Sequence, residues 1–166
     1  MPFTLLRNGL YTERYTDHLR EYLEDGEIMG AAGNGGISAA SRQDYAAAAA
    51  AAILQDERGD RTYELGGPAF GLPQLARVIC EVTGAKVTYR DLPAKEYAHE
   101  LHGAGLDEAT ARFVAAVDAS IARGELETTS ADLANLLGQA ATGLTKGLQP
   151  TRPSRTTPAW RCRRRC

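Results

Sequence analysis

The spacing of apolar and polar residues along the first part of the chain predicts strands and helices in alternation. Short runs of β-type residues predict three strands, at residues 3–7, 61–65 and 87–91. A helix over residues 12–25 gathers four apolar residues on one face, Tyr15, Leu19, Tyr22 and Leu23. Gly26 is typical of the residue that ends such a helix.

Helical patterns dominate the rest of the chain. Ser41 and Asp44 have the spacing of a helix cap, and the seven alanines at 46–52 favour a helix that lies close to a sheet. Further helices are predicted at residues 72–83, 93–102, 107–123 and 130–138. Alternating strands and helices followed by a helical end predict an α/β layer structure with a smaller helical lobe.

Residues 27–40 ("EIMGAAGNGGISAA") allow two interpretations. The Asn34-Gly35 dipeptide is suited to a type I′ turn and predicts a hairpin. Alternatively, Gly30, Gly33 and Gly36 have the spacing of a dinucleotide-binding loop, with Asp56 where a ribose-binding acid is expected. That loop requires a helix directly after it, whereas "ISAAS" intervenes, so we favour the hairpin.

Length and charge divide the chain into a folded body and a tail. The 166 residues with 43% apolar content suit one domain, which we place at residues 1–146. Residues 147–166 hold six of the 19 basic residues, none of the 21 acidic ones and three prolines, which leaves the body a formal charge of −8. We expect this basic tail to be disordered and to be an unselected extension rather than a nucleic-acid-binding segment.

No targeting or membrane-spanning segment is predicted from the sequence. It contains neither a run of 18 apolar residues nor a charged leader followed by an apolar region. We therefore expect a cytoplasmic protein.

The residues themselves indicate no complete catalytic or metal site. A short-chain dehydrogenase pair would place a tyrosine four residues before a lysine, but Lys86, Lys95 and Lys146 follow Val82, Asp91 and Thr142. His99 and His102 share a helical face, yet zinc needs at least one further ligand. We expect no metal and assign no catalytic residue.

Several linked motifs nevertheless resemble one family. In order along the chain they are "FTLLRNGLYTERY", "GAAGNGGISAASRQDYAAAAA", "YELGGPAF" and "VTYRDLPAKEYA". Together, over residues 2–146, they resemble the C-terminal half of NADPH-dependent quinone oxidoreductases of the NmrA-like group of atypical short-chain dehydrogenases. The resemblance implies the C-terminal part of a Rossmann-like NAD(P)-binding fold plus a small, mostly helical substrate lobe, with the N-terminal dinucleotide-binding half absent.

The resemblance also implies five cofactor-side residues, Arg7, Asn8, Gly9, Tyr11 and Arg42. It places the first four at the carboxyl end of a strand beside the nicotinamide, where open α/β sheets bind ligands. Asn8 would offer its amide, Gly9 close backbone approach, Tyr11 a stacking wall and Arg42 a charge for a phosphate. Without the resemblance, Asn8-Gly9 is only a turn, Tyr11 a core aromatic and Arg42 a surface charge.

The expected function is therefore that of an NAD(P)H-dependent, quinone reductase-like oxidoreductase, truncated and impaired alone. The alternatives are a non-catalytic NAD(P)-binding redox sensor and an inactive fragment. The resemblance implies NADP(H) as cofactor, with weak or no binding by this chain alone, and a quinone-like small-molecule substrate. We expect no nucleic-acid or membrane partner, and an exposed sheet edge would favour self-association.

Overall fold

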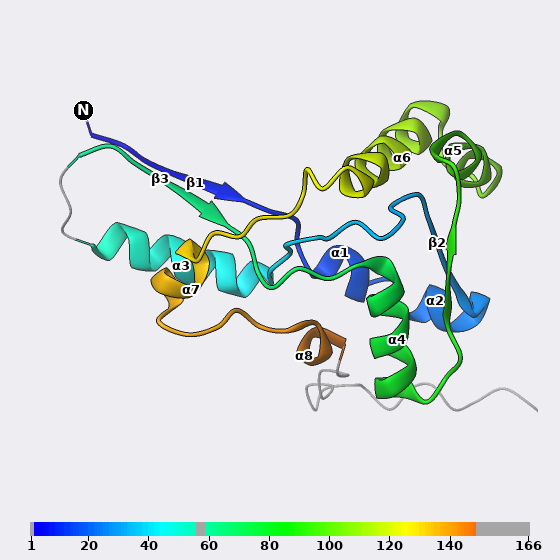
Figure 1. The fold of residues 1–166 in the computed structure, drawn as a ribbon, viewed down its shortest axis with the longest axis horizontal. Coiled ribbons are helices and arrows are strands. Elements are labelled where there is room, and N and C mark those ends of the chain that lie inside the picture. Colours follow the sequence, from blue (N-terminus) through cyan, green and yellow to red (C-terminus); the bar gives the residue numbers. More distant parts are fainter. Residues whose placement is uncertain (1, 56–58, 149–166) are drawn as a thin grey trace, which may run out of the picture.

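The computed structural model describes residues 2–55 and 59–148 (Figure 1). The elements of the first half are β1 (Thr4–Asn8), α1 (Glu13–Thr16), α2 (Leu19–Asp25), β2 (Glu27–Gly30), α3 (Arg42–Leu54) and β3 (Arg61–Leu65). The second half contains α4 (Leu72–Thr83), β4 (Thr88–Asp91), α5 (Ala94–Gly103), α6 (Glu108–Ala122), α7 (Asp132–Leu137) and α8 (Leu144–Leu148). The predicted α/β class is confirmed, and the three predicted strands form within one residue of their expected bounds.

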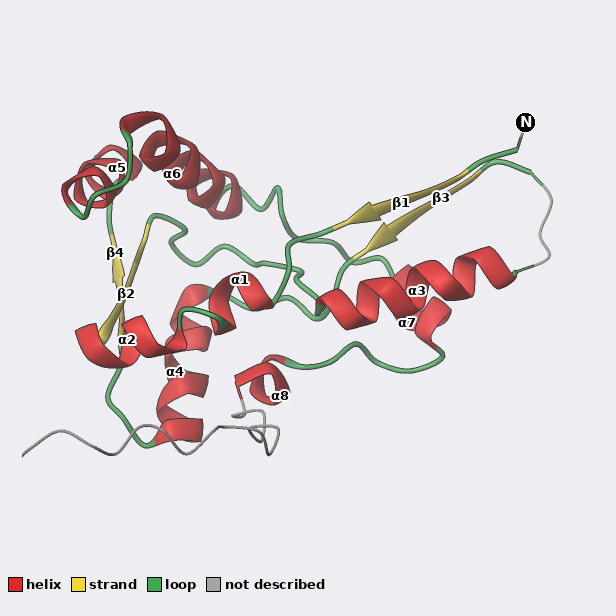
Figure 2. Ribbon diagram, turned by 180° about the vertical axis from the view of Figure 1, so that it is seen from behind, coloured by secondary structure: helices red, strands yellow, loops and turns green. Residues whose placement is uncertain are grey.

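The strands form two parallel pairs at opposite ends of the molecule (Figures 1 and 2). In one pair β1 runs beside β3, with Thr4 opposite Arg61 and Asn8 opposite Leu65. In the other, β2 runs beside β4, with Glu27 opposite Thr88. Parallel neighbours require long crossover connections, so each pair joins segments that are far apart in the sequence.

The predicted hairpin within residues 27–40 is wrong. The strand β2 pairs with β4, and Ile37 forms an antiparallel bridge with Phe70 instead of pairing back onto β2. Gly35 is needed for close packing, because a Cβ atom there would overlap the Ile121 carbonyl at the end of α6. Tertiary contacts therefore override the local turn preference of Asn-Gly.

Local signals predict most helices correctly. Ser41 Oγ accepts a hydrogen bond from the Asp44 amide at 3.0 Å, which caps α3 as expected. Gly84 ends α4 in the left-handed conformation, with φ of 73°. The predicted helix over 12–25 instead forms two helices, because the backbone leaves the helical conformation at His18 (φ −91°, ψ 7°).

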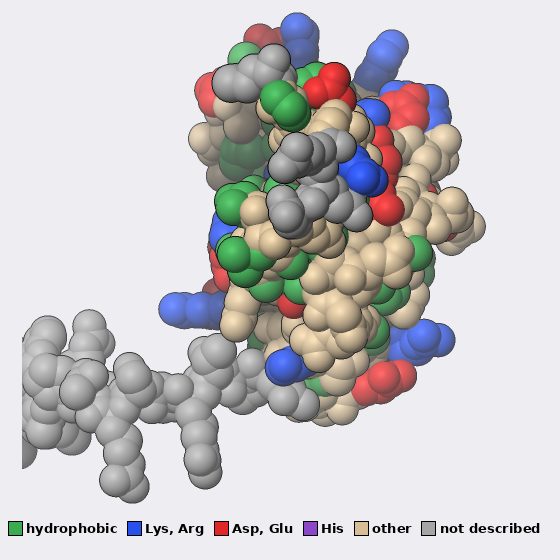
Figure 3. All heavy atoms as spheres, turned by 90° about the vertical axis from the view of Figure 1, so that its left-hand side faces the viewer, with side chains coloured by type: hydrophobic (Ala, Val, Ile, Leu, Met, Phe, Trp, Pro, Cys, Tyr) green, Lys and Arg blue, Asp and Glu red, His purple; other side chains and the backbone are tan. Residues whose placement is uncertain are grey.

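The sheet β1–β3 is covered by helices α3 and α7, which also pack against each other. Leu6, Tyr63 and Leu65 contact this side and join the core beneath α3. On β1, Phe3 and Leu5 are 53% and 48% exposed. Figure 3 views this end of the molecule and shows hydrophobic side chains at the surface among charged ones. Within the described residues β1 has a single strand partner, so the self-association expected at this edge stays a prediction.

The folded body continues past the predicted start of the tail. The structure places Gly147 and Leu148, which were expected in the tail, at the end of α8, and Leu148 is 2% exposed in the main core. The remainder of the tail and Asp56 lie outside the described residues. None of the helices in the described part of the chain is long and apolar enough to cross a membrane.

Candidate functional site

The candidate site lies where the chain leaves the carboxyl end of β1. Residues 9–12 run beside residues 38–42, with Tyr11 and Ala40 forming a parallel bridge. The Thr12 amide donates to the Ala40 carbonyl at 3.0 Å, and the Ala40 amide donates to the Leu10 carbonyl at 3.1 Å. This pairing brings the "RNGLY" segment against the start of α3. We call the residues gathered there, Gly9, Tyr11, Arg42 and Tyr45, the β1-end cluster.

Gly9 has a packing reason for its identity. Its amide donates to the Leu65 carbonyl at 2.8 Å, continuing the ladder of the sheet. A Cβ atom at this position would lie 2.6 Å from the Ser38 carbonyl oxygen and 3.2 Å from Tyr45 Oη. The close backbone approach that the sequence predicts at Gly9 is therefore an approach to the protein's own chain.

Tyr11 connects the other members of the cluster. Its ring meets Tyr45 edge-on, with centroids 5.6 Å apart, and the Arg42 guanidinium carbon lies 5.0 Å from its centroid. Tyr11 is 40% exposed, whereas Tyr45 is buried. Burial raises the pKa of Tyr45 to about 12, so its hydroxyl stays protonated at neutral pH. The partly exposed ring of Tyr11 therefore packs against the buried, neutral phenol of Tyr45.

Arg42 supplies a positive charge beside the Tyr11 ring. Its amide donates to both carboxylate oxygens of Glu13, at 3.0 and 3.2 Å. Its guanidinium group makes no ion pair within residues 2–55 and 59–148, so it can contact an anionic group of a ligand. A planar ring on Tyr11 and an anion at Arg42 are the interactions this geometry offers.

The other two predicted residues stand apart from the cluster. Asn8 is the exposed last residue of β1, next to Gly9. Arg7 forms an ion pair with Glu64 on β3, with Arg7 Nη1 2.6 Å from Glu64 Oε1. Both side chains are largely exposed, so the pair contributes little stability. The structure therefore brings Gly9, Tyr11 and Arg42 together, with Asn8 at the edge and Arg7 bound to the sheet.

The glycine-rich loop after β2 is internally satisfied. The amides of Ala31, Ala32 and Gly33 donate to Asp118 Oδ2 at 2.9 Å, Tyr89 Oη at 3.0 Å and Asp91 Oδ1 at 2.9 Å. Asp91 Oδ1 also accepts the Tyr89 hydroxyl at 2.7 Å. A pyrophosphate cradle needs such amides free, with a helix starting directly behind them. Here they are occupied, and the next helix begins only at Arg42, so the alternative dinucleotide interpretation fails.

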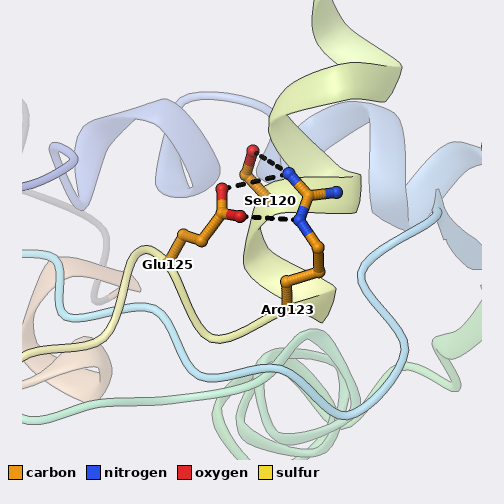
Figure 4. Close-up of polar contacts among 3 residues, drawn as sticks. All are labelled: Ser120, Arg123 and Glu125. Atoms are coloured by element: carbon orange, nitrogen blue, oxygen red, sulfur yellow. Dashed lines mark hydrogen bonds and ion pairs between the residues drawn. The ribbon is translucent and has the colours of Figure 1, made fainter.

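A contact at the end of α6 fixes the segment that lies behind the cluster. Arg123 donates to both carboxylate oxygens of Glu125, at 2.6 and 3.0 Å, and to Ser120 Oγ at 3.0 Å (Figure 4). The hydrogen bonds from Arg123 lower the pKa of Glu125. The chain then continues to Leu126, whose carbonyl accepts the Ser38 amide at 3.0 Å. The turn after α6 thus holds the backbone against which Gly9 packs.

The sequence did not single out three of the residues that shape these sites. Glu13 and Tyr45 lie within the quoted motifs, where the pattern indicates only that they belong to helices. Asp118 can be recognised in the sequence as an acidic residue at a position of α6 that faces the core. In the structure it is 7% exposed. No group of three His, Cys, Asp or Glu side chains that could hold a metal occurs among the residues described.

Parallel strands covered by helices, with a cluster at the carboxyl end of β1, are typical of α/β folds that bind ligands at that edge of the sheet, the NAD(P)-binding folds among them. No family model matches the chain. It is 39% identical to quinone oxidoreductase 2 of Escherichia coli over 147 residues, which is 88% of this chain and 51% of that protein. The crystal structure of the NADPH-dependent E. coli enzyme with NADPH superposes with a TM-score of 0.83, covering 87% of this chain and 52% of that one.

A second solved structure supports the same conclusion. The Citrobacter sp. triphenylmethane reductase complexed with NADP(H) is 33% identical, with a TM-score of 0.83 over 89% of this chain and 52% of that one. The resemblance to NADPH-dependent quinone oxidoreductases of the NmrA-like type is confirmed. The chain spans about half the length of these relatives, at 51% and 52%.

Proposed function

We propose that this chain forms the nicotinamide-side and acceptor-side wall of an NADPH-dependent quinone oxidoreductase. The observation that carries the proposal is the β1-end cluster, in which Arg42 and Tyr11 stand exposed at the carboxyl end of a parallel strand. Relatives with the same fold have been solved with NADPH or NADP(H). In this proposal Arg42 binds a cofactor phosphate, Tyr11 packs against a flat ring and Asn8 hydrogen-bonds to the nicotinamide ribose or carboxamide.

The proposed reaction requires little acid–base catalysis by the protein. A reduced nicotinamide supplies the hydride, and a quinone is already electron-poor, so the protein orients the two and excludes water. This agrees with the absence of a tyrosine–lysine pair from the sequence. The proposal keeps the expectation of a cytoplasmic location and of a quinone-like substrate.

A steady-state assay tests the proposal. Purified chain is mixed with NADPH and 1,4-benzoquinone, and NADPH oxidation is compared with the rate in buffer. Because weak binding is expected of this chain alone, the assay uses millimolar NADPH. We expect slow turnover above buffer that falls about tenfold to a hundredfold in Arg42→Met, since a charge-assisted contact to a phosphate contributes about 1.5–3 kcal/mol. Arg20→Met is the matched control, since Arg20 is 88% exposed on α2 and its ion pair is with Glu24, away from the cluster.

Binding without turnover distinguishes the redox-sensor alternative. NADPH-dependent thermal stabilisation that is lost in Arg42→Met, with no NADPH oxidation, would favour a sensor. The proposal is contradicted if the chain shows neither turnover nor stabilisation at millimolar NADPH. It is also contradicted if Arg42→Met and Arg20→Met behave alike.

A further inference from the structure

A cavity of about 380 Å³ lies between α1, α2, β2 and the α5–α6 pair. It shares no residue with the β1-end cluster, yet α1 connects the two, because Arg14 and Tyr15 of α1 line the cavity and Tyr11 lies two residues before that helix. Cavities of this volume hold small organic molecules. We call it the tyrosine cavity.

Three tyrosines, Tyr15, Tyr22 and Tyr97, give the cavity aromatic walls. Tyr15 and Tyr97 are 6% and 8% exposed. Burial raises the pKa of each to about 12, so both phenols are neutral at physiological pH. The Tyr15 hydroxyl is buried and has no hydrogen-bond partner among the described residues. Neutral phenol rings present the electron-rich faces that attract cations.

Charge adds a second preference. Four carboxylates line the cavity, those of Glu21, Asp25, Glu27 and Asp118, against one guanidinium group, that of Arg14. The formal charge of the lining is therefore −3 with His18 neutral. It becomes −2 when Arg90 is included, because Arg90 Nε lies 3.4 Å from Glu27 Oε1. An acidic, aromatic lining attracts a positively charged ring more strongly than a neutral one.

Asp118 lies at the buried side of this lining. It is 7% exposed, and its Oδ2 accepts the Ala31 amide at 2.9 Å. Its Oδ1 makes no hydrogen bond within the described part of the chain. Because Asp118 lines the cavity, a positive group of a ligand can approach this oxygen, and the Arg14 charge nearby offsets only part of the acidity of the lining.

We propose that the tyrosine cavity binds a flat aromatic cation, with its ring among Tyr15, Tyr22 and Tyr97 and its charge towards Asp118 and the acidic rim. A role for such a cation as hydride acceptor rests on the proposed function, but its binding does not. Cofactor-free binding therefore tests this inference separately, and it can fail or succeed whatever the NADPH assay shows.

The test compares two rings of the same shape. N-methylquinolinium carries a permanent positive charge, whereas quinoline is neutral at pH 8. Calorimetric titration of the full chain should give a dissociation constant about tenfold lower for the cation, and this preference should shrink with added salt. Equal affinity for the two rings, tighter quinoline binding, or no binding of N-methylquinolinium at millimolar concentration would overturn the proposal.

Two variants locate the binding. Asp25 is exposed at the rim and has no ion-pair partner in the described residues, so Asp25→Asn should fold and weaken N-methylquinolinium binding severalfold while leaving quinoline binding unchanged. Glu24→Gln is the matched control on the same helix, because Glu24 lies outside the cavity lining and should change neither affinity. Equal N-methylquinolinium affinity in wild type and Asp25→Asn would place the cation elsewhere and refute the assignment.

Discussion

Asp118 should hold the glycine-rich loop through one buried hydrogen bond, and a pair of substitutions isolates it. Asp118→Asn keeps an oxygen that can accept the Ala31 amide, whereas Asp118→Leu has a similar size and no acceptor. Both variants remove the charge, so the difference between their free energies of unfolding reports the loss of the hydrogen-bond acceptor. Ala31 is 7% exposed, and an unsatisfied buried amide costs about 1–3 kcal/mol. We expect Asp118→Leu to unfold with a free energy lower than Asp118→Asn by that amount.

Urea unfolding followed by circular dichroism measures the difference. The midpoint should fall from Asp118→Asn to Asp118→Leu while the m-value stays constant, which identifies a change in stability rather than in the denatured state. A leucine variant that is as stable as the asparagine variant would refute the role assigned to this hydrogen bond.

The same site predicts a dependence on pH. Burial raises the pKa of Asp118 above its ordinary value of 3.8, so the native protein holds this proton more tightly than the unfolded chain. The contribution of Asp118 to stability is therefore complete below 3.8 and is lost as pH rises through the raised native pKa. The stability of wild type relative to Asp118→Asn should fall over that window. A relative stability that is constant or rises with pH would contradict this sign.

The remaining predictions concern packing near the β1-end cluster. Gly9→Ala should lower the free energy of unfolding by about 1–3 kcal/mol, because its Cβ would meet the Ser38 carbonyl at 2.6 Å. Gly103→Ala, where a Cβ meets nothing within 4 Å, is the control and should leave thermal stability unchanged or slightly raised. Asp44 accepts both the Thr142 amide at 2.8 Å and the Thr142 hydroxyl at 3.1 Å, so Asp44→Ala should cost about 1–3 kcal/mol. Thr142→Val, which removes only the hydroxyl, should cost about 0.5–1.5 kcal/mol, and equal losses in the two variants would show that the amide contact contributes nothing.

Local chemistry explains what the sequence predicts correctly. The Ser41 cap of α3 and the Gly84 stop of α4 depend on residues within one helical turn, so both appear as expected. Strand β3 is also predicted from local sequence, since its run of β-type residues ends at Gly66 and Gly67. The resemblance carried by several motifs in order predicts the family type, which the relatives confirm.

Long-range contacts explain what the sequence does not predict. The Asn34-Gly35 hairpin fails because the amides of the preceding residues are taken by Tyr89, Asp91 and Asp118, more than fifty positions later. No local pattern indicates that partner set. Helix α8 was also unexpected, since its five residues are too short to give a period and depend on burial of Leu148.

In the β1-end cluster, too, the sequence indicates some of the residues, whereas their arrangement depends on long-range contacts. The resemblance implied Tyr11 and Arg42, but their stacking at 5.0 Å depends on pairing between residues 9–12 and 38–42 that only the fold reveals. Tyr45, whose ring meets Tyr11 edge-on, could not be distinguished in the sequence from an ordinary buried helix residue.

Amide chemical-shift mapping by NMR can decide which loop meets the cofactor. Reduced nicotinamide mononucleotide is titrated into isotope-labelled chain to millimolar concentration, where binding energies of about 4 kcal/mol are detectable. We expect the largest shifts at Asn8, Gly9, Tyr11 and Arg42, with the amides of Ala31, Ala32 and Gly33 unmoved. Largest shifts at those three loop amides, or no shift anywhere, would contradict the assignment of the cofactor side to the end of β1.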